Sequence, residues 1–276
     1  MPQRGRRRLL AGVCAVLMGP VPAWSRSIAT RGPEAQAADT LPVLRQASGH
    51  PMRYWLSLPR QWTPGRRWPV VVTLDGGNKA WLTNAEGFAR ERNRRNYSFI
   101  LVTPEILSNG GTDLRHMAEY HYASSVWDEV ERTGRCRFDV EGLHAILADV
   151  QRQYGGERTY FVTGWSAGGH LTWALVFREP ERLRAAALSG ANFNGRCLTN
   201  EVPHAFPVSR APERTRLPVK LFEGSDDPAL TSPQPIAAMR LASENGYATV
   251  SRDTIQGMPH SPMPEQVLRF FNSLVR

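Results

Sequence analysis

The sequence predicts an α/β domain, in which a mostly parallel central sheet has helices on both faces. Short continuous apolar runs recur along the chain, as expected for strands that are buried on both sides. Segments with helical spacing alternate with these runs, which is the pattern of βαβ units. With 276 residues and 41% hydrophobic content, the chain is long and apolar enough to form one sizeable core.

The expected elements follow one another in a regular order. Strands are expected at 52–59, 70–75, 98–104, 158–164, 184–190, 219–224 and 248–255. Helices are expected at 84–95, 140–154, 167–177, 235–245 and 264–274. Neither an internal repeat nor a linker interrupts this order, so we expect one domain over residues 51–276.

An aromatic-rich excursion at 105–137 breaks the pattern. Long irregular segments in compact domains are often lids or binding loops. This one carries Tyr120, Tyr122 and Trp127. Together with Trp165, these side chains are candidates to line a substrate pocket, and packing in the core explains them equally well.

The N-terminus is typical of an export signal. A basic stretch, "RGRRRLL", precedes an apolar run over 9–23 that is too short to span a bilayer, and Arg6-Arg7 resembles a twin-arginine signal. We expect an export signal over 1–25, with cleavage after Ala23 or as late as Ala37, and a flexible lead-in over 26–50. The protein is then periplasmic or secreted and has no stable membrane association after signal removal; an uncleaved anchor is the alternative.

The formal charge of +9 does not indicate nucleic-acid binding. The basic residues are 32 Arg and only 2 Lys; several arginines lie in the expected signal and the others are scattered. This distribution reflects composition more than a binding patch, so no nucleic-acid partner is expected.

Two cysteines remain once the export signal is removed. Cys14 lies in the signal, which leaves Cys136 at the end of the excursion and Cys197 after the strand at 184–190. Because exported proteins fold under oxidising conditions, we expect a Cys136–Cys197 disulfide that fixes the excursion near the strands' carboxyl ends. Two separate thiols are the alternative.

Ser166 is the candidate nucleophile. It stands in "FVTGWSAGGHLTW", a G-x-S-x-G pattern between an expected strand and an expected helix. A serine on such a sharp turn needs small neighbours, and Gly164 and Gly168 supply them. The helix N-terminus beneath Ser166 favours the negative charge that develops in acyl transfer.

A serine nucleophile needs a general base and an acid that orients the base. In this architecture they follow in the order Ser, acid, His. "GSDDP" supplies Asp226 and Asp227 directly after a late strand, and "GMPHSP" supplies His260 after the last strand. The other histidines fit this order less well: His50, His116, His121, His144, His170 and His204.

The oxyanion of the tetrahedral intermediate needs preorganised N–H donors. Ala167, the residue after the nucleophile, is one candidate. Gly77 and Asn78, in the "LDGGNKAW" loop after the strand at 70–75, are candidates for the other, although "DGG" is also a common turn. No H-E-x-x-H or comparable cluster indicates a metal site.

From about Trp68 to Leu274 the chain resembles the α/β-hydrolase superfamily. "LDGG", "GWSAGGH" and "GSDDP" are most similar to secreted esterases of the polyhydroxybutyrate depolymerase-like and feruloyl-esterase-like group. The resemblance implies an eight-stranded sheet, an acyl-enzyme mechanism without a cofactor, and small or polymeric carboxylic-ester substrates. It also favours Asp227 over Asp226, because the acid in this family commonly stands three residues after the glycine that ends its strand. One departure is Asp75-Gly76, where many members carry His-Gly.

The sequence therefore predicts an exported serine carboxylic-ester hydrolase with the triad Ser166, Asp227 and His260. A serine peptidase of the same fold is the first alternative, since a fold does not set the substrate. A non-catalytic binding module on the same scaffold is the second, but none of the three triad residues is missing.

Overall fold

The structure is a computed structural model that describes residues 40–111, 113–193, 196–197 and 208–275. The expected export signal, the first part of the expected lead-in and His204 lie outside the described residues. Within the described part of the chain, no helix is both long enough and apolar enough to cross a membrane.

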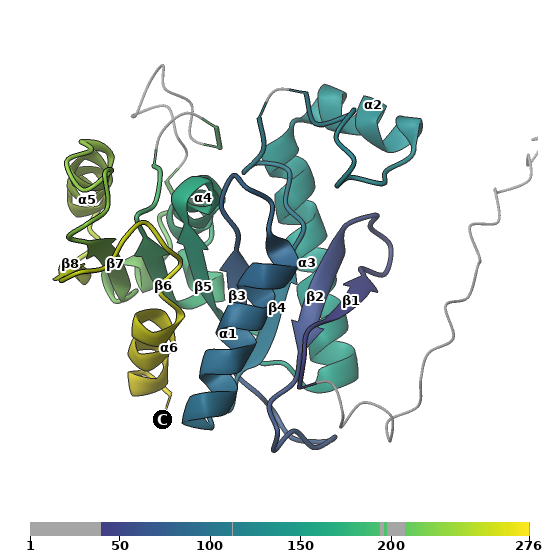
Figure 1. Ribbon diagram of the computed structural model, residues 1–276, viewed down its shortest axis with the longest axis horizontal. Helices are drawn as coiled ribbons and strands as arrows, with labels where there is room; N and C mark the ends of the chain where they lie inside the picture. Colours follow the sequence, from purple (N-terminus) through teal and green to yellow (C-terminus); the bar gives the residue numbers. More distant parts are fainter. Residues whose placement is uncertain (1–39, 112, 194–195, 198–207, 276) are drawn as a thin grey trace, which may run out of the picture.

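A single eight-stranded sheet forms the centre of the molecule (Figure 1). Its spatial order is β1-β2-β4-β3-β5-β6-β7-β8. The strand β2 runs antiparallel to both of its neighbours, and all the other pairings are parallel. The strands are β1 (Val43–Gln46), β2 (Arg53–Ser57), β3 (Val70–Leu74), β4 (Ile100–Pro104), β5 (Tyr160–Trp165), β6 (Leu183–Ser189), β7 (Val219–Gly224) and β8 (Val250–Ile255). The predicted mostly parallel sheet is confirmed.

Helices cover both faces of the sheet, as predicted (Figure 1). Helices α1 (Trp81–Arg95) and α6 (Pro264–Ser273) pack together on one face. The other face is covered by α3 (Arg135–Tyr154), α4 (Gly169–Arg178) and α5 (Gln234–Glu244). The short helix α2 (Ser124–Thr133) packs against α3.

Alternation along the buried strands divides the core into two layers. Val71 and Phe161 face α1 and α6, and the ring of Phe161 lies 4.8 Å from that of Phe271 on α6. Their neighbours Val70, Val72 and Val162 belong to the cluster on the opposite face. Because successive side chains of a strand point to opposite faces, strands covered on both sides read as the continuous apolar runs seen in the sequence.

Three local features differ from the expectations. The strand β1 lies inside the expected flexible lead-in; it is a four-residue edge strand with alternating half-buried and exposed residues, so it has no apolar run. The excursion at 105–137 contains α2, which buries only Trp127 and Val130. Helix α3 begins at Arg135, directly after Gly134, and so starts before the expected residue 140.

The parallel strands bring four loops to one edge of the sheet. The loops after β3, β5, β7 and β8 carry Asp75, Ser166, Asp227 and His260 respectively. Since the carboxyl ends of parallel strands share one edge, residues far apart in sequence meet there. This edge is where a site can form.

Candidate active site

Ser166 lies on a sharp turn between β5 and α4, which a short 3₁₀ turn, η2 (Ser166–Gly168), connects. Its φ of 49° falls in the left-handed region, which is unfavourable for a serine by roughly 1–2 kcal/mol. The two glycines that flank Ser166 stand where no side chain would fit. A Cβ on Gly168 would lie 2.5 Å from the carbonyl oxygen of Leu74, and one on Gly164 would collide with Thr172. The glycines therefore allow β3, β5 and α4 to approach closely enough to present the serine.

Asp227 and His260 form a hydrogen-bonded pair. Nδ1 of His260 lies 2.7 Å from Oδ2 of Asp227, and Asp227 is only 5% exposed. Its other oxygen, Oδ1, accepts a hydrogen bond from the backbone N–H of Ala229 at 2.7 Å. Asp226 is exposed instead, and its Oδ1 accepts from the hydroxyl of Ser225. The structure thus places Asp227, and not Asp226, against the imidazole.

Gly190 makes room for this pair and was not anticipated from the sequence. It follows β6 with a φ of 48°. A Cβ at this position would lie 2.7 Å from Oδ2 of Asp227 and 2.9 Å from Nδ1 of His260. The only sequence signal was a glycine at the end of an apolar run, "ALSG", which by itself indicates no more than a turn.

Trp165, the residue before Ser166, lies against the imidazole of His260. Its ring centroid lies 5.2 Å from that of His260, at a tilt of 51°. Its indole N–H donates a hydrogen bond to Oδ1 of Asp75 at 2.9 Å. Burial raises the pKa of the Asp75 carboxyl, and the hydrogen bond from Trp165 acts in the opposite direction. Asp75, the departure from the family's His-Gly pattern, therefore holds the indole that lies against the histidine.

The candidate oxyanion donors come from two loops that touch. A Cβ built on Gly77 would lie 3.7 Å from the Cβ of Ala167, the residue after the serine. Ala167 is buried, whereas Gly77 and Asn78 are exposed. The loop is also strained at Lys79, whose φ is 55°. The structure thus brings Gly77 next to Ala167, and Asn78 is the residue that follows it.

The aromatic residues of the excursion pack against one another. Tyr120 lies 6.2 Å from Tyr122 and 5.9 Å from Trp127, measured between ring centroids, and the cluster continues to Trp81 and Phe138. Tyr120 and Trp127 are nearly fully buried, and the hydroxyl of Tyr120 donates to the carbonyl of Ile106. This cluster forms a core beneath the excursion. Trp165 makes its ring contact with His260 instead.

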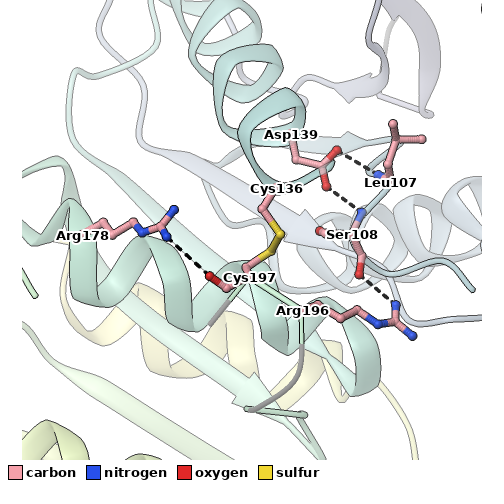
Figure 2. Close-up of a disulfide and its surroundings, with 7 residues drawn as sticks. All are labelled: Leu107, Ser108, Cys136, Asp139, Arg178, Arg196 and Cys197. Carbon is pink, nitrogen blue, oxygen red and sulfur yellow. Dashed lines mark hydrogen bonds between the residues drawn. A yellow bond between two sulfur atoms is a disulfide. The ribbon is translucent and has the colours of Figure 1, made fainter. Parts of the chain in front are cut away.

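The expected disulfide joins Cys136 and Cys197, with Cα atoms 5.4 Å apart. Cys136 lies at the start of α3, and Cys197 lies in the segment after β6 (Figure 2). The excursion is therefore tied covalently to the chain segment that follows a central strand.

The other described histidines lie in ordinary structural positions. His170 is 4% exposed, and burial together with the charge of Arg196 lowers its pKa to about 4. His144 pairs with Glu179 at 2.7 Å, and His50 packs on Phe138. Among the described residues, no group of three or more His, Cys, Asp or Glu side chains is arranged to hold a metal ion.

Comparison with known proteins gives the family. A model of the family described as "Putative esterase" matches residues 46–260 of this chain. No curated protein matches the chain significantly in sequence. Because the match covers well over half of the chain, it shows the family directly.

Solved structures give the same fold at low sequence identity. The chain is similar to poly(aspartic acid) hydrolase-1 from Sphingomonas sp. KT-1 (14% identity, TM-score 0.59, covering 85% of this chain and 98% of that one). It is equally similar to an S-formylglutathione hydrolase from Agrobacterium tumefaciens (14%, 0.59, 85% and 95%). A "putative dipeptidyl aminopeptidase IV" from Bacteroides ovatus also matches (16%, 0.56), although the chain spans only 36% of that longer protein. The chain belongs to the esterase family of α/β-hydrolase fold.

Proposed function

We propose that this protein is an exported serine hydrolase that cleaves carboxylic esters through an acyl-enzyme. The observation that carries the proposal is the hydrogen bond between the buried Asp227 and the half-buried His260, whose imidazole lies against Trp165, the residue directly before Ser166. A buried carboxylate on Nδ1 holds the imidazole in the tautomer whose Nε2 can accept a proton. It also stabilises the imidazolium that forms when the serine reacts.

Each step of the reaction has a group to perform it. Ser166 Oγ bonds to the ester carbonyl carbon while His260 takes the hydroxyl proton. The backbone N–H groups of Ala167 and Gly77 stabilise the oxyanion. As the intermediate collapses, the alcohol leaves with the proton from His260, and the acyl group remains on Ser166. A water molecule then attacks in the same way and releases the carboxylic acid and the free serine.

The proposed substrate class is supported by the family and by the sequence motifs. The esterase family supports a hydrolase, and the motif resemblance favours carboxylic esters, either small molecules or polyesters, with no cofactor. A serine peptidase is the second candidate, because a protein named as a dipeptidyl aminopeptidase IV has the same fold.

We also place the protein outside the cytoplasm. The basic and apolar N-terminal pattern supports export, and the Cys136–Cys197 bridge supports an oxidising compartment such as the periplasm. N-terminal sequencing of the protein recovered from that compartment tests this directly. A mature chain that still begins at Met1 would contradict cleavage.

A panel of substrates tests the activity: p-nitrophenyl esters of rising chain length, a feruloyl ester and a peptide amide. Ser166→Ala should lower kcat by at least about 10³-fold and leave the fold intact, because only the attacking oxygen is removed. Ser125→Ala, on the exposed side of α2, is the matched control. Faster cleavage of the amide than of any ester would indicate the peptidase. Wild-type rates no higher than those of Ser166→Ala would indicate a binding module.

A further inference from the structure

The side chain of Asn109 contacts the loop after β3, which carries the proposed oxyanion donors Gly77 and Asn78. Asn109 follows β4, is 1% exposed and belongs to the excursion at 105–137. Its side-chain Nδ2 donates to the carbonyl oxygen of Asp75 at 3.1 Å and to that of Gly76 at 2.8 Å. Because both facing atoms are carbonyl oxygens, which only accept, the amide nitrogen must be the atom that faces them.

These two hydrogen bonds fix the direction of a backbone N–H group. In a planar trans peptide, the C=O of one residue and the N–H of the next point in opposite directions. Holding the Gly76 oxygen toward Asn109 therefore points the Gly77 N–H away from Asn109. Gly77 itself lies next to Ala167, which supplies the other proposed donor.

The backbone that carries Asn109 is itself held from two sides. Asp139 on α3 accepts the N–H groups of Leu107 and Ser108 at 2.8 and 2.7 Å. Arg196 donates to the carbonyl of Ser108 at 2.8 Å (Figure 2). Asp139 lies three residues after Cys136 on α3, and Arg196 directly precedes Cys197, so the disulfide ties the two holding residues to each other.

We propose that Asn109 is a positioning residue for the oxyanion hole, fixing the peptide plane that aims the Gly77 N–H at the reacting carbonyl oxygen. This inference rests on the proposed function, since an oxyanion forms only if Ser166 attacks a carbonyl group. The amide of Asn109 does not touch the substrate. It acts by keeping the peptide between Gly76 and Gly77 from rotating, so its loss should affect the transition state more than substrate binding.

The test compares Asn109→Leu and Asn109→Asp with Asn245→Ala. Leucine branches at Cγ as asparagine does but is larger, and ionised aspartate keeps the shape of asparagine; both remove the two donors. Asn245 is a matched control, because its Nδ2 also donates to a backbone carbonyl, that of Leu241 at 2.8 Å, at the far end of α5. If Asn109→Leu does not fold, Asn109→Asp tests the same loss.

The readouts are kcat and KM on a p-nitrophenyl ester, the affinity for a boronic acid that forms a tetrahedral adduct with the serine, and the melting temperature. Removing an oxyanion donor lowers kcat by about 10²–10³-fold, and misaiming one should lower it somewhat less, by about 10- to 100-fold. We expect that loss in kcat with KM nearly unchanged and a parallel loss of boronate affinity in both Asn109 variants, but not in Asn245→Ala.

Two results would overturn the proposal: a folded Asn109 variant with kcat and boronate affinity within about threefold of wild type, or a change in melting temperature alone. Failure of the underlying function is distinguishable, because it appears in the parent protein. In that case Ser166→Ala retains the wild-type rate, or the wild type hydrolyses no ester, whatever stands at residue 109.

Discussion

The replacement Asp227→Asn tests the hydrogen-bond geometry around His260. Both oxygens of Asp227 are used: Oδ1 accepts the N–H of Ala229, and Oδ2 contacts Nδ1 of His260, each at 2.7 Å. An asparagine keeps the bond from Ala229 only if its oxygen takes the Oδ1 position. Its NH2 group then faces Nδ1 and donates to it, which places the imidazole proton on Nε2. In that tautomer Nε2 cannot accept the proton of Ser166.

The expected loss is about 10⁴-fold in kcat, as for the same exchange in chymotrypsin-like proteases, or about 5.5 kcal/mol in activation free energy. Asp226→Asn is the matched control, since Asp226 is exposed and its carboxylate accepts a hydrogen bond from its neighbour Ser225. Its kcat should stay within about threefold of wild type, in line with the small effect of surface substitutions.

Initial rates on p-nitrophenyl acetate at pH 8, with melting temperatures recorded in parallel, give both values. The opposite pattern, with Asp226→Asn inactive and Asp227→Asn near normal, would refute the assignment by one residue. Equal, small losses in the two variants would refute the tautomer argument itself.

Three further perturbations test other parts of the structure. Replacing both Cys136 and Cys197 with serine should lower the free energy of unfolding by up to about 4 kcal/mol for their separation of 61 residues, as seen in urea denaturation; an unchanged midpoint would contradict this. His260→Gln should lower kcat by at least about 10³-fold, whereas His170→Gln, at a buried residue whose pKa is lowered to about 4, should stay within a few-fold; equal losses would contradict the choice of base. Burial raises the pKa of Asp139 to about 6 from 3.8, so the folded protein binds this proton more tightly than the unfolded chain. The resulting stabilisation is complete below about pH 4 and is lost as pH rises through 6, a change of about 3 kcal/mol that Asp139→Asn should remove; parallel pH–stability curves would contradict it.

The sequence by itself determined the fold class and the order of the site residues. Strands buried on both faces need apolar side chains on both, so β3, β4, β5 and β6 were visible as runs in the sequence. Ser166 was recognisable because a strand, a tight glycine-flanked turn and a helix are all local features. Edge strand β1 escaped prediction, since a half-exposed strand of four residues carries too little pattern.

Only the tertiary structure decided which side chains meet. Asp226 and Asp227 are adjacent and chemically identical, and burial of Asp227 against His260 depends on how the loops after β7 and β8 fold over Gly190. Asn109 gave no sequence signal, because an asparagine in an irregular segment is typical of any turn, and its two hydrogen bonds reach across 33 and 34 residues of chain. Likewise, the aromatic residues of the excursion read equally well as pocket or core, and their contacts place them in a core. Local patterns specify strands and turns, whereas contacts between distant loops arise only when the whole sheet brings its carboxyl ends together.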